Sequence, residues 1–82
     1  MNRSEIQESI QLIFRDIFLD ESIEITEQTS PEDIDEWDSM AHVTILTAIE
    51  AELNFQFTAE DMGECINVRM IIDRAEKRLD NS

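Results

Sequence analysis

The stretch EWDSMAHVTILTAIEAEL, residues 36 to 53, predicts the central helix of this chain. Acids and one tryptophan give way at Asp38 or Ser39 to a segment that we expect to be helical to about Leu53. Its apolar residues cover most of a helical wheel, which is typical of a helix that is buried on several sides or binds a partner. These residues are Met40, Ala41, Val43, Ile45, Leu46, Ala48, Ile49 and Leu53.

Ser39 stands at the junction of the acidic and apolar runs, and two interpretations of it stay open. A serine at a helix start can be a simple N-cap. It can equally be a chemical handle, because a hydroxyl at a helix start is exposed. Asp38 and His42 are close by, but such near neighbours rarely reach the geometry of a catalytic triad, and a G-x-S-x-G motif is missing from the sequence. We therefore do not expect a hydrolase.

The flanking sequence predicts three more helices. Ser4 is expected to cap a first helix that reaches about Phe18. Thr58 is expected to cap a short helix over residues 59–64 through a Thr-x-x-Asp capping box, and Asn67 to cap the last helix. The first helix has its core face at Ile6, Ile10, Ile13, Phe14, Ile17 and Phe18, and the last at Val68, Ile71, Ile72, Ala75 and Leu79.

The connection over residues 19–38 is long for a small domain, and such loops are often functional. Its apolar residues Ile23, Ile25, Ile34 and Trp37 should pack on the core and hold it in place. The pattern as a whole predicts an all-α fold: a small four-helix bundle with three longer helices, a short third helix and one long loop between the first and second. We expect residues 1–82 to form a single domain.

The charge of the chain excludes several classes of function. Twenty acids against six basic residues give a net charge of −14 over 82 residues. Nucleic-acid binding and docking on anionic membranes both need positive charge, so neither is expected. No apolar run is long enough to insert into a membrane, the N-terminus lacks the apolar core of a signal peptide, and one cysteine cannot form an internal disulfide. We expect a cytoplasmic monomer that attracts basic partners and is sensitive to salt.

The sequence offers little for metal binding or for a nucleophile other than Ser39. Asp33, Asp35 and Asp38 do not match the EF-hand spacing of calcium loops, and one Cys and one His cannot make a zinc site, so no metal is expected. His42 is expected to be a structural or surface residue, and Cys65 a small buried one.

The stretch Asp38-Ser39-Met40, followed by Val43, Leu46, Ile49-Glu50 and Leu53, resembles the motif of acyl carrier proteins. The order of helices and the long acidic loop are also similar to that family over nearly the whole chain. The resemblance implies that Ser39 accepts 4′-phosphopantetheine from coenzyme A through a separate Mg²⁺-dependent transferase, with Asp38 orienting the transfer. The thiol of that arm would carry acyl or aminoacyl groups as thioesters, and the domain would catalyse nothing itself.

The resemblance also implies partners and surfaces. A discrete carrier would meet a phosphopantetheinyl transferase, an acyl-loading ligase or acyltransferase, and a ketosynthase or other acyl-processing enzymes. A nearly neutral stripe on the central helix could be a docking face or part of the core, and both interpretations stay open. The stripe comprises Met40, Thr44, Thr47 and Ala51. A sheltered acyl chain should enter between the second and third helices near Val43, Ile49, Met62 and Ile66.

Two features separate this chain from well-known fatty-acid carriers. Trp37 stands where many carriers have a small residue, and we expect it to anchor the loop on the bundle. The neutral stripe replaces an acidic one, which favours a dedicated carrier of a polyketide, peptide, polysaccharide or cell-wall pathway. The alternative class is an acidic adaptor that binds a basic protein, with Ser39 serving only as a helix cap.

Overall fold

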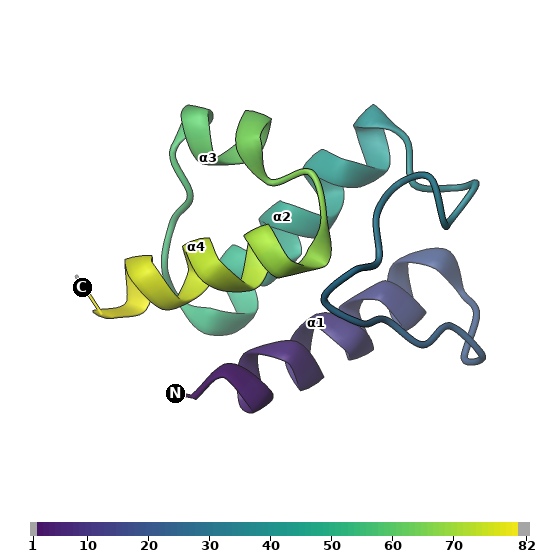
Figure 1. Cartoon of the computed structure of the whole chain (residues 1–82), viewed down its shortest axis with the longest axis horizontal. Helices are drawn as coiled ribbons and strands as arrows, with labels where there is room; N and C mark the ends of the chain where they lie inside the picture. Colours follow the sequence, from purple (N-terminus) through teal and green to yellow (C-terminus); the bar gives the residue numbers. More distant parts are fainter. Residues whose placement is uncertain (1, 81–82) are drawn as a thin grey trace.

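The computed structural model describes residues 2–80, which form the four predicted helices (Figure 1). They are α1 (Arg3–Phe18), α2 (Ser39–Leu53), α3 (Ala59–Glu64) and α4 (Val68–Asp80). No strand occurs in the described part of the chain, so the prediction of an all-α bundle with a short third helix and a long first loop is confirmed. Residues 1, 81 and 82, the ends of the predicted domain, lie outside the described range.

The N-cap of helix α1 lies two residues before the predicted cap. Asn2 is the N-cap, because its Oδ1 accepts a hydrogen bond of 2.9 Å from the Glu5 backbone N–H, and the Glu5 carboxylate accepts one of 3.1 Å from the Asn2 N–H. This reciprocal pair is a capping box. The prediction that Ser4 caps the helix was wrong, since Ser4 already lies in the first turn. Both residue types can cap a helix, and Glu5 at the third helical position favours Asn2.

The caps of the last two helices are as predicted. Thr58 accepts a hydrogen bond from the Asp61 N–H at 3.1 Å, and Asp61 completes the box by accepting one from the Thr58 N–H at 3.0 Å. Asn67 accepts a bond of 2.8 Å from the Met70 N–H at the start of α4. Each cap satisfies backbone donors that have no partner within their own helix.

The core lies where α1 contacts α2 and α4, and the long loop closes one end of it (Figure 1). The apolar residues expected to fix this loop do so: Ile25 and Trp37 are buried, and Ile23 and Ile34 pack against the core. The fully enclosed apolar side chains are Ile6, Ile10, Phe14, Ile45, Leu46, Ile49, Cys65, Val68, Ile71, Ile72 and Ala75. A core of this kind, drawn from α1, α2 and α4 with Cys65 at the end of α3, is the main source of stability in a chain of this size.

Polar contacts also fix the loop. The Gln11 side chain donates to the Ile23 carbonyl at 2.7 Å and accepts from the Ile25 N–H at 2.8 Å. Further along, the carbonyls of Glu27 and Thr29 accept hydrogen bonds of 3.0 and 2.9 Å from the first N–H groups of α4. The loop is therefore bonded to α1 and to α4 before it reaches α2.

Candidate functional site

Asp38, not Ser39, caps α2. The Asp38 Oδ1 accepts a hydrogen bond of 2.9 Å from the Ala41 N–H, and its backbone carbonyl accepts one of 2.8 Å from the His42 N–H. Ser39 is the first residue of the helix itself. The interpretation of Ser39 as a helix cap was wrong, because the preceding aspartate performs that task.

The Ser39 side chain is exposed, and its hydroxyl is available for chemistry. Within residues 2–80 its hydroxyl makes no hydrogen bond, and the backbone N–H groups of Ser39 and Met40 find no protein acceptor. Free N–H groups and the helix dipole give this end of α2 a partial positive charge, which favours a bound anion. An exposed hydroxyl on a rigid, positively polarised helix start is a suitable position for a phosphate ester.

An apolar groove of about 500 Å³ lies beside Ser39, between the start of α2 and the end of α3. Val43 and Ile66 are unusually exposed for such residues, at 52% and 61%, and Met62 lines the groove with them. Ile49, the fourth residue of the expected acyl cavity, is not among the residues that line the groove, and its side chain is fully enclosed in the core. The groove therefore opens at the surface and does not extend along α2 as far as that residue.

The stripe of Met40, Thr44, Thr47 and Ala51 lies on the exposed side of α2. Met40 is 81% exposed, and the Thr44 hydroxyl donates to the Met40 carbonyl at 3.0 Å, so it is satisfied within the helix. The core side of α2 is supplied by Ile45, Leu46 and Ile49 instead. The stripe is therefore exposed to solvent, and the interpretation of these residues as part of the core is excluded.

Trp37 and His42, which flank Ser39 in the sequence, join this site to the rest of the bundle. The Trp37 indole packs edge-on against Phe14 of α1, with ring centroids 5.0 Å apart, so Trp37 is the predicted loop anchor. Its Nε1–H donates to His42 Nδ1 at 3.0 Å, and His42 Nε2 is 3.1 Å from the Met62 carbonyl oxygen. His42 is therefore structural, as expected from the sequence.

Cys65 lines the groove but is fully enclosed. Burial, followed by the nearby negative charge of Asp61, raises the pKa of the Cys65 thiol to about 11. A thiol in this state is protonated at neutral pH and is a poor nucleophile. The expectation of a small buried residue is confirmed.

The ion-pair cluster that attaches α3 to α4 was not predicted from the sequence. Asp61 is fully enclosed, and its carboxylate accepts hydrogen bonds from Arg78 Nε at 2.8 Å and from Arg74 Nη1 at 2.6 Å. The hydrogen bond from Arg78, supported by the Thr58 N–H and by Arg74, holds the pKa of Asp61 far below its ordinary value of 3.8. The spacings of 13 and 17 residues follow no helical period, so the sequence carried no signal for this cluster.

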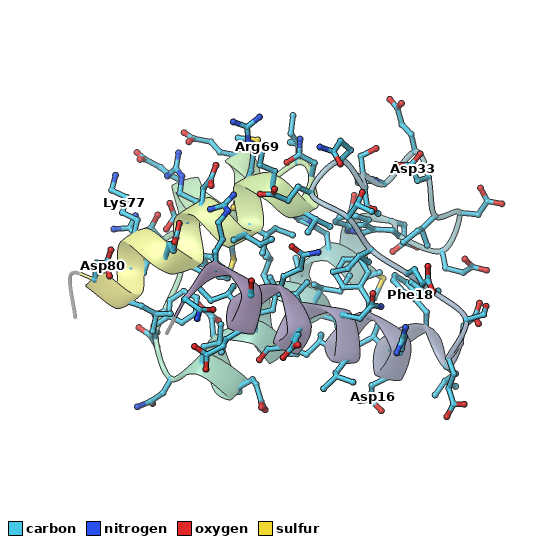
Figure 2. The ribbon with its side chains drawn as sticks, turned by 60° about the horizontal axis from the view of Figure 1, so that its bottom comes forward. Asp16, Phe18, Asp33, Arg69, Lys77 and Asp80 are labelled. Atoms are coloured by element: carbon cyan, nitrogen blue, oxygen red, sulfur yellow. The ribbon has the colours of Figure 1, made fainter. Side chains whose placement is uncertain are left out.

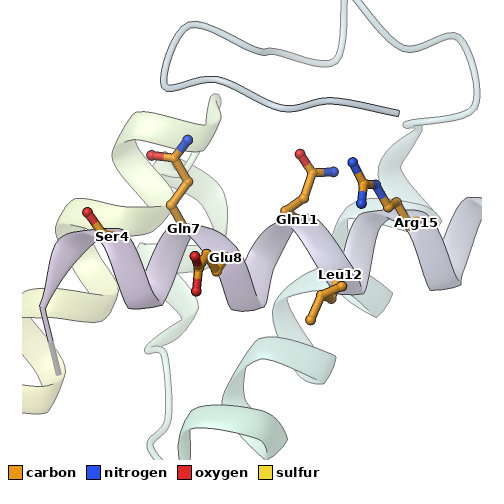
Figure 3. Close-up of a pocket in the computed structure, with 6 residues that line it drawn as sticks. All are labelled: Ser4, Gln7, Glu8, Gln11, Leu12 and Arg15. Carbon is orange, nitrogen blue, oxygen red and sulfur yellow. The ribbon is translucent and has the colours of Figure 1, made fainter. Parts of the chain in front are cut away.

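A second hollow of about 500 Å³ runs along α1 (Figure 3). Gln11 and Arg15 line it, and both side chains donate to the Ile23 carbonyl. Its polar wall therefore serves to hold the loop, and it shares no lining residue with the groove beside Ser39. Figure 3 shows Leu12 on a different side of α1 from these two residues.

Acidic side chains surround the loop that precedes Ser39. Figure 2 shows Asp33 projecting from this loop at one end of the molecule, while Lys77 lies at the other end on α4. Glu32, Asp33, Asp35, Glu36 and Asp38 are exposed or nearly so. No helix among the described residues is long and apolar enough to cross a membrane, and none of their acidic, His or Cys side chains form a group that could hold a metal ion.

These features together define a small helical bundle with an exposed serine at the start of its central helix. The solution structure of a holo acyl carrier protein from Geobacter metallireducens has the same fold, with a TM-score of 0.84 and 32% sequence identity over 93% of this chain and 87% of that one. No family model matches the chain, and no curated protein matches it significantly. On the structural likeness and identity, the chain belongs to the acyl carrier protein family.

Proposed function

We propose that this protein is a carrier that receives 4′-phosphopantetheine on the Ser39 hydroxyl and presents acyl or aminoacyl groups to partner enzymes. The observation that carries the proposal is the state of Ser39: exposed, without a hydrogen-bond partner among the described residues, and first in a helix already capped by Asp38. The solved relative is a holo protein, which supports the same modification here.

The residues around Ser39 fit a phosphodiester. The free N–H groups of Ser39 and Met40 and the dipole of α2 would stabilise its negative charge, and solvent surrounds the side chain. Asp38 keeps the helix start rigid through its bond to the Ala41 N–H, so the arm has a fixed origin. When attached, the group supplies a thiol that holds cargo as a thioester. The chain itself offers no competing nucleophile at the groove, because Cys65 is enclosed and protonated.

The exposed stripe of α2 and the acidic loop before it are suited to a two-step encounter with a partner. The acids would attract a basic enzyme from a distance, and Met40 and Thr44 would then meet an uncharged surface on it. We infer that the partners are a phosphopantetheinyl transferase, a loading ligase or acyltransferase, and acyl-processing enzymes such as a ketosynthase. The neutral stripe favours a dedicated polyketide, peptide, polysaccharide or cell-wall pathway, and the protein catalyses no step of it.

Intact mass spectrometry tests the attachment. The protein is incubated with coenzyme A, Mg²⁺ and a permissive phosphopantetheinyl transferase, and a gain of one phosphopantetheine is expected. Ser39→Ala should abolish the gain and leave the fold intact, since Asp38 provides the cap. Ser4→Ala is the matched control, because Ser4 is also exposed in the first turn of a helix. If several transferases give no gain in mass, the alternative function, an acidic adaptor that binds a basic protein, replaces the carrier.

A further inference from the structure

The Trp37–His42–Met62 relay is the only hydrogen-bonded link from α2 to α3 that we find among the described residues, and its direction is fixed by chemistry. An indole N–H can only donate, so His42 Nδ1 must accept from Trp37. The imidazole is then neutral with its proton on Nε2, and that N–H donates to the Met62 carbonyl. One side chain thereby connects the loop before Ser39 to the helix on the other side of the groove.

The Met62 carbonyl accepts this bond because α3 stops too early to use it. In a longer helix the Ile66 N–H would bond to Met62, but it bonds to the Glu64 carbonyl at 2.9 Å instead. A carbonyl in the last turn of a helix needs an outside partner. His42 supplies that partner and so fixes the side of α3 that faces the groove. Asp61 separately attaches α3 to α4 through Arg74 and Arg78.

The relay also closes the groove toward the core. Trp37 and His42 line the groove, and behind Trp37 lies Phe14, which is fully enclosed. Protein cores are close-packed, so a chain that goes deeper must move α3 away from α2. Such a movement breaks the bond between His42 and Met62.

We propose that His42 is a positioning residue that limits how deeply a chain tethered at Ser39 can enter the bundle, so that the groove shelters only short cargo. The link to cargo rests on the proposed function, whereas the depth of the groove does not. Short apolar chains fit between Val43 and Ile66 with the relay intact. Longer chains stay in solvent unless the relay opens.

The relay is tested first in the unmodified protein. The chain has one tryptophan, so a single indole N–H resonance reports on the bond to His42. His42→Phe keeps a ring but removes both polar ends, and hydrogen exchange of the indole should accelerate about fivefold, the equivalent of one net hydrogen bond. Thr47→Val, an exposed change on the same helix, should leave it unchanged. Unchanged exchange in His42→Phe overturns the proposal.

Groove depth is tested with alkyl chains attached directly, without any transferase. In Ser39→Cys, hexyl and dodecyl methanethiosulfonates react at the exposed site, since Cys65 is enclosed. With His42 present, both chains should shift the α3 amide resonances equally. With His42→Phe, the dodecyl chain should shift them further. An equal response to both chains in each background, or a further dodecyl shift with His42 present, overturns the proposal.

His42→Asn separates the two halves of the relay and replaces His42→Phe if that variant does not fold. Its amide oxygen lies near the position of Nδ1 and can still accept from Trp37, but the side chain is too short to reach Met62. Slow indole exchange together with deep dodecyl entry is the expected result. If the dodecyl chain does not enter more deeply in this variant, the bond between His42 and Met62 is not what limits the depth of entry. Failure of enzymatic modification at Ser39 would count against the proposed function and would leave both of these measurements valid.

Discussion

At the scale of single residues, the site depends on the different roles of two adjacent residues, Asp38 and Ser39. Asp38 takes the capping task, which leaves the Ser39 hydroxyl free of internal hydrogen bonds within the described residues. The order of the pair matters, because the N-cap side chain turns back to the helix while the first helical residue points outward. Ser39 therefore gains exposure without a loss of helix stability.

Asp61 is expected to contribute strongly to folding. Asp61→Asn keeps the size of the side chain but removes the charge that Arg74 and Arg78 bond to. Since hydrogen bonds to charged groups are worth more than neutral ones, the free energy of unfolding should fall by about 2 kcal/mol. Urea unfolding measures this, with the exposed Glu60→Gln as control. A loss no greater than that of the control would show that the cluster contributes nothing.

The stability difference between the wild-type protein and Asp61→Asn should depend on pH. The pKa of Asp61 is lowered in the folded state, so its stabilising effect is complete above the ordinary value of 3.8 and is lost as the pH falls from there toward the lower folded value. The difference in unfolding free energy between wild type and Asp61→Asn should therefore be constant near neutral pH and shrink below about pH 4. A difference that stays constant on acidification would contradict this assignment.

Cys65 should be inert in the native protein. Its thiol is enclosed and its pKa is raised to about 11, so at pH 8 the reactive thiolate is scarce and inaccessible. Iodoacetamide should leave the mass of the native protein unchanged and add one carbamidomethyl group in urea. Rapid alkylation without urea would show that the groove floor opens easily.

At the scale of elements, α2 has two working faces and α3 depends on its neighbours. The core face of α2 packs on α1, and its outer face displays Met40 and Thr44 beside Ser39. Helix α3 is too short to be stable alone, so its position depends on Asp61 at one side and on His42 at the other. The groove next to Ser39 therefore depends on polar contacts as well as on apolar packing.

The outer face of α2 predicts which substitutions impair partner recognition. Met40→Glu and Thr44→Glu each place a charge where we expect an uncharged contact, and a penalty of about 1.4 kcal/mol would lower kcat/KM of thioester loading about tenfold. Leu12→Glu is the matched control, since Leu12 is 64% exposed on α1. Circular dichroism confirms that the variants fold. Unchanged loading in both α2 variants would exclude the stripe as a docking face.

At the scale of the whole molecule, charge opposes compaction. The net charge of −14 is concentrated on the loop and the helices that surround the site, and only six basic residues offset it. Three of those are already engaged: Arg3 pairs with Glu27, Asp73 and Glu76, Arg74 pairs with Asp61 and Glu64, and Arg78 pairs with Asp61. The excess acids therefore repel one another, and this repulsion is greater in the folded state than in the extended chain.

Salt should consequently stabilise the protein. Raising NaCl from about 0.01 M to about 0.15 M shortens the screening length from about 30 Å to about 8 Å. If this relieves about 1 kcal/mol of repulsion, Tm rises by roughly 5 °C for a domain of this size. NaCl and KCl should act alike, because screening does not distinguish them. A flat or falling Tm would mean that ion pairs such as those of Asp61 outweigh the repulsion.

Local patterns in the sequence were sufficient to predict the helices, the loop anchors, the caps at Thr58 and Asn67, and the serine at the start of α2. Such features depend on residues a few positions apart, whose periodicity and capping chemistry are visible in one dimension. Where two nearby residues could both cap a helix, the sequence did not decide between them correctly. It favoured Ser4 over Asn2 for α1, and it left Asp38 and Ser39 open for α2.

Only the tertiary structure decided which side chains meet across the bundle. It enclosed Asp61 between Arg74 and Arg78, linked Trp37 through His42 to Met62, put Ile49 in the core and left Val43 and Ile66 at the groove. These outcomes depend on how the helices pack and on where α3 ends. Contacts between residues far apart in sequence are set by the packing of the whole core, which no local pattern contains.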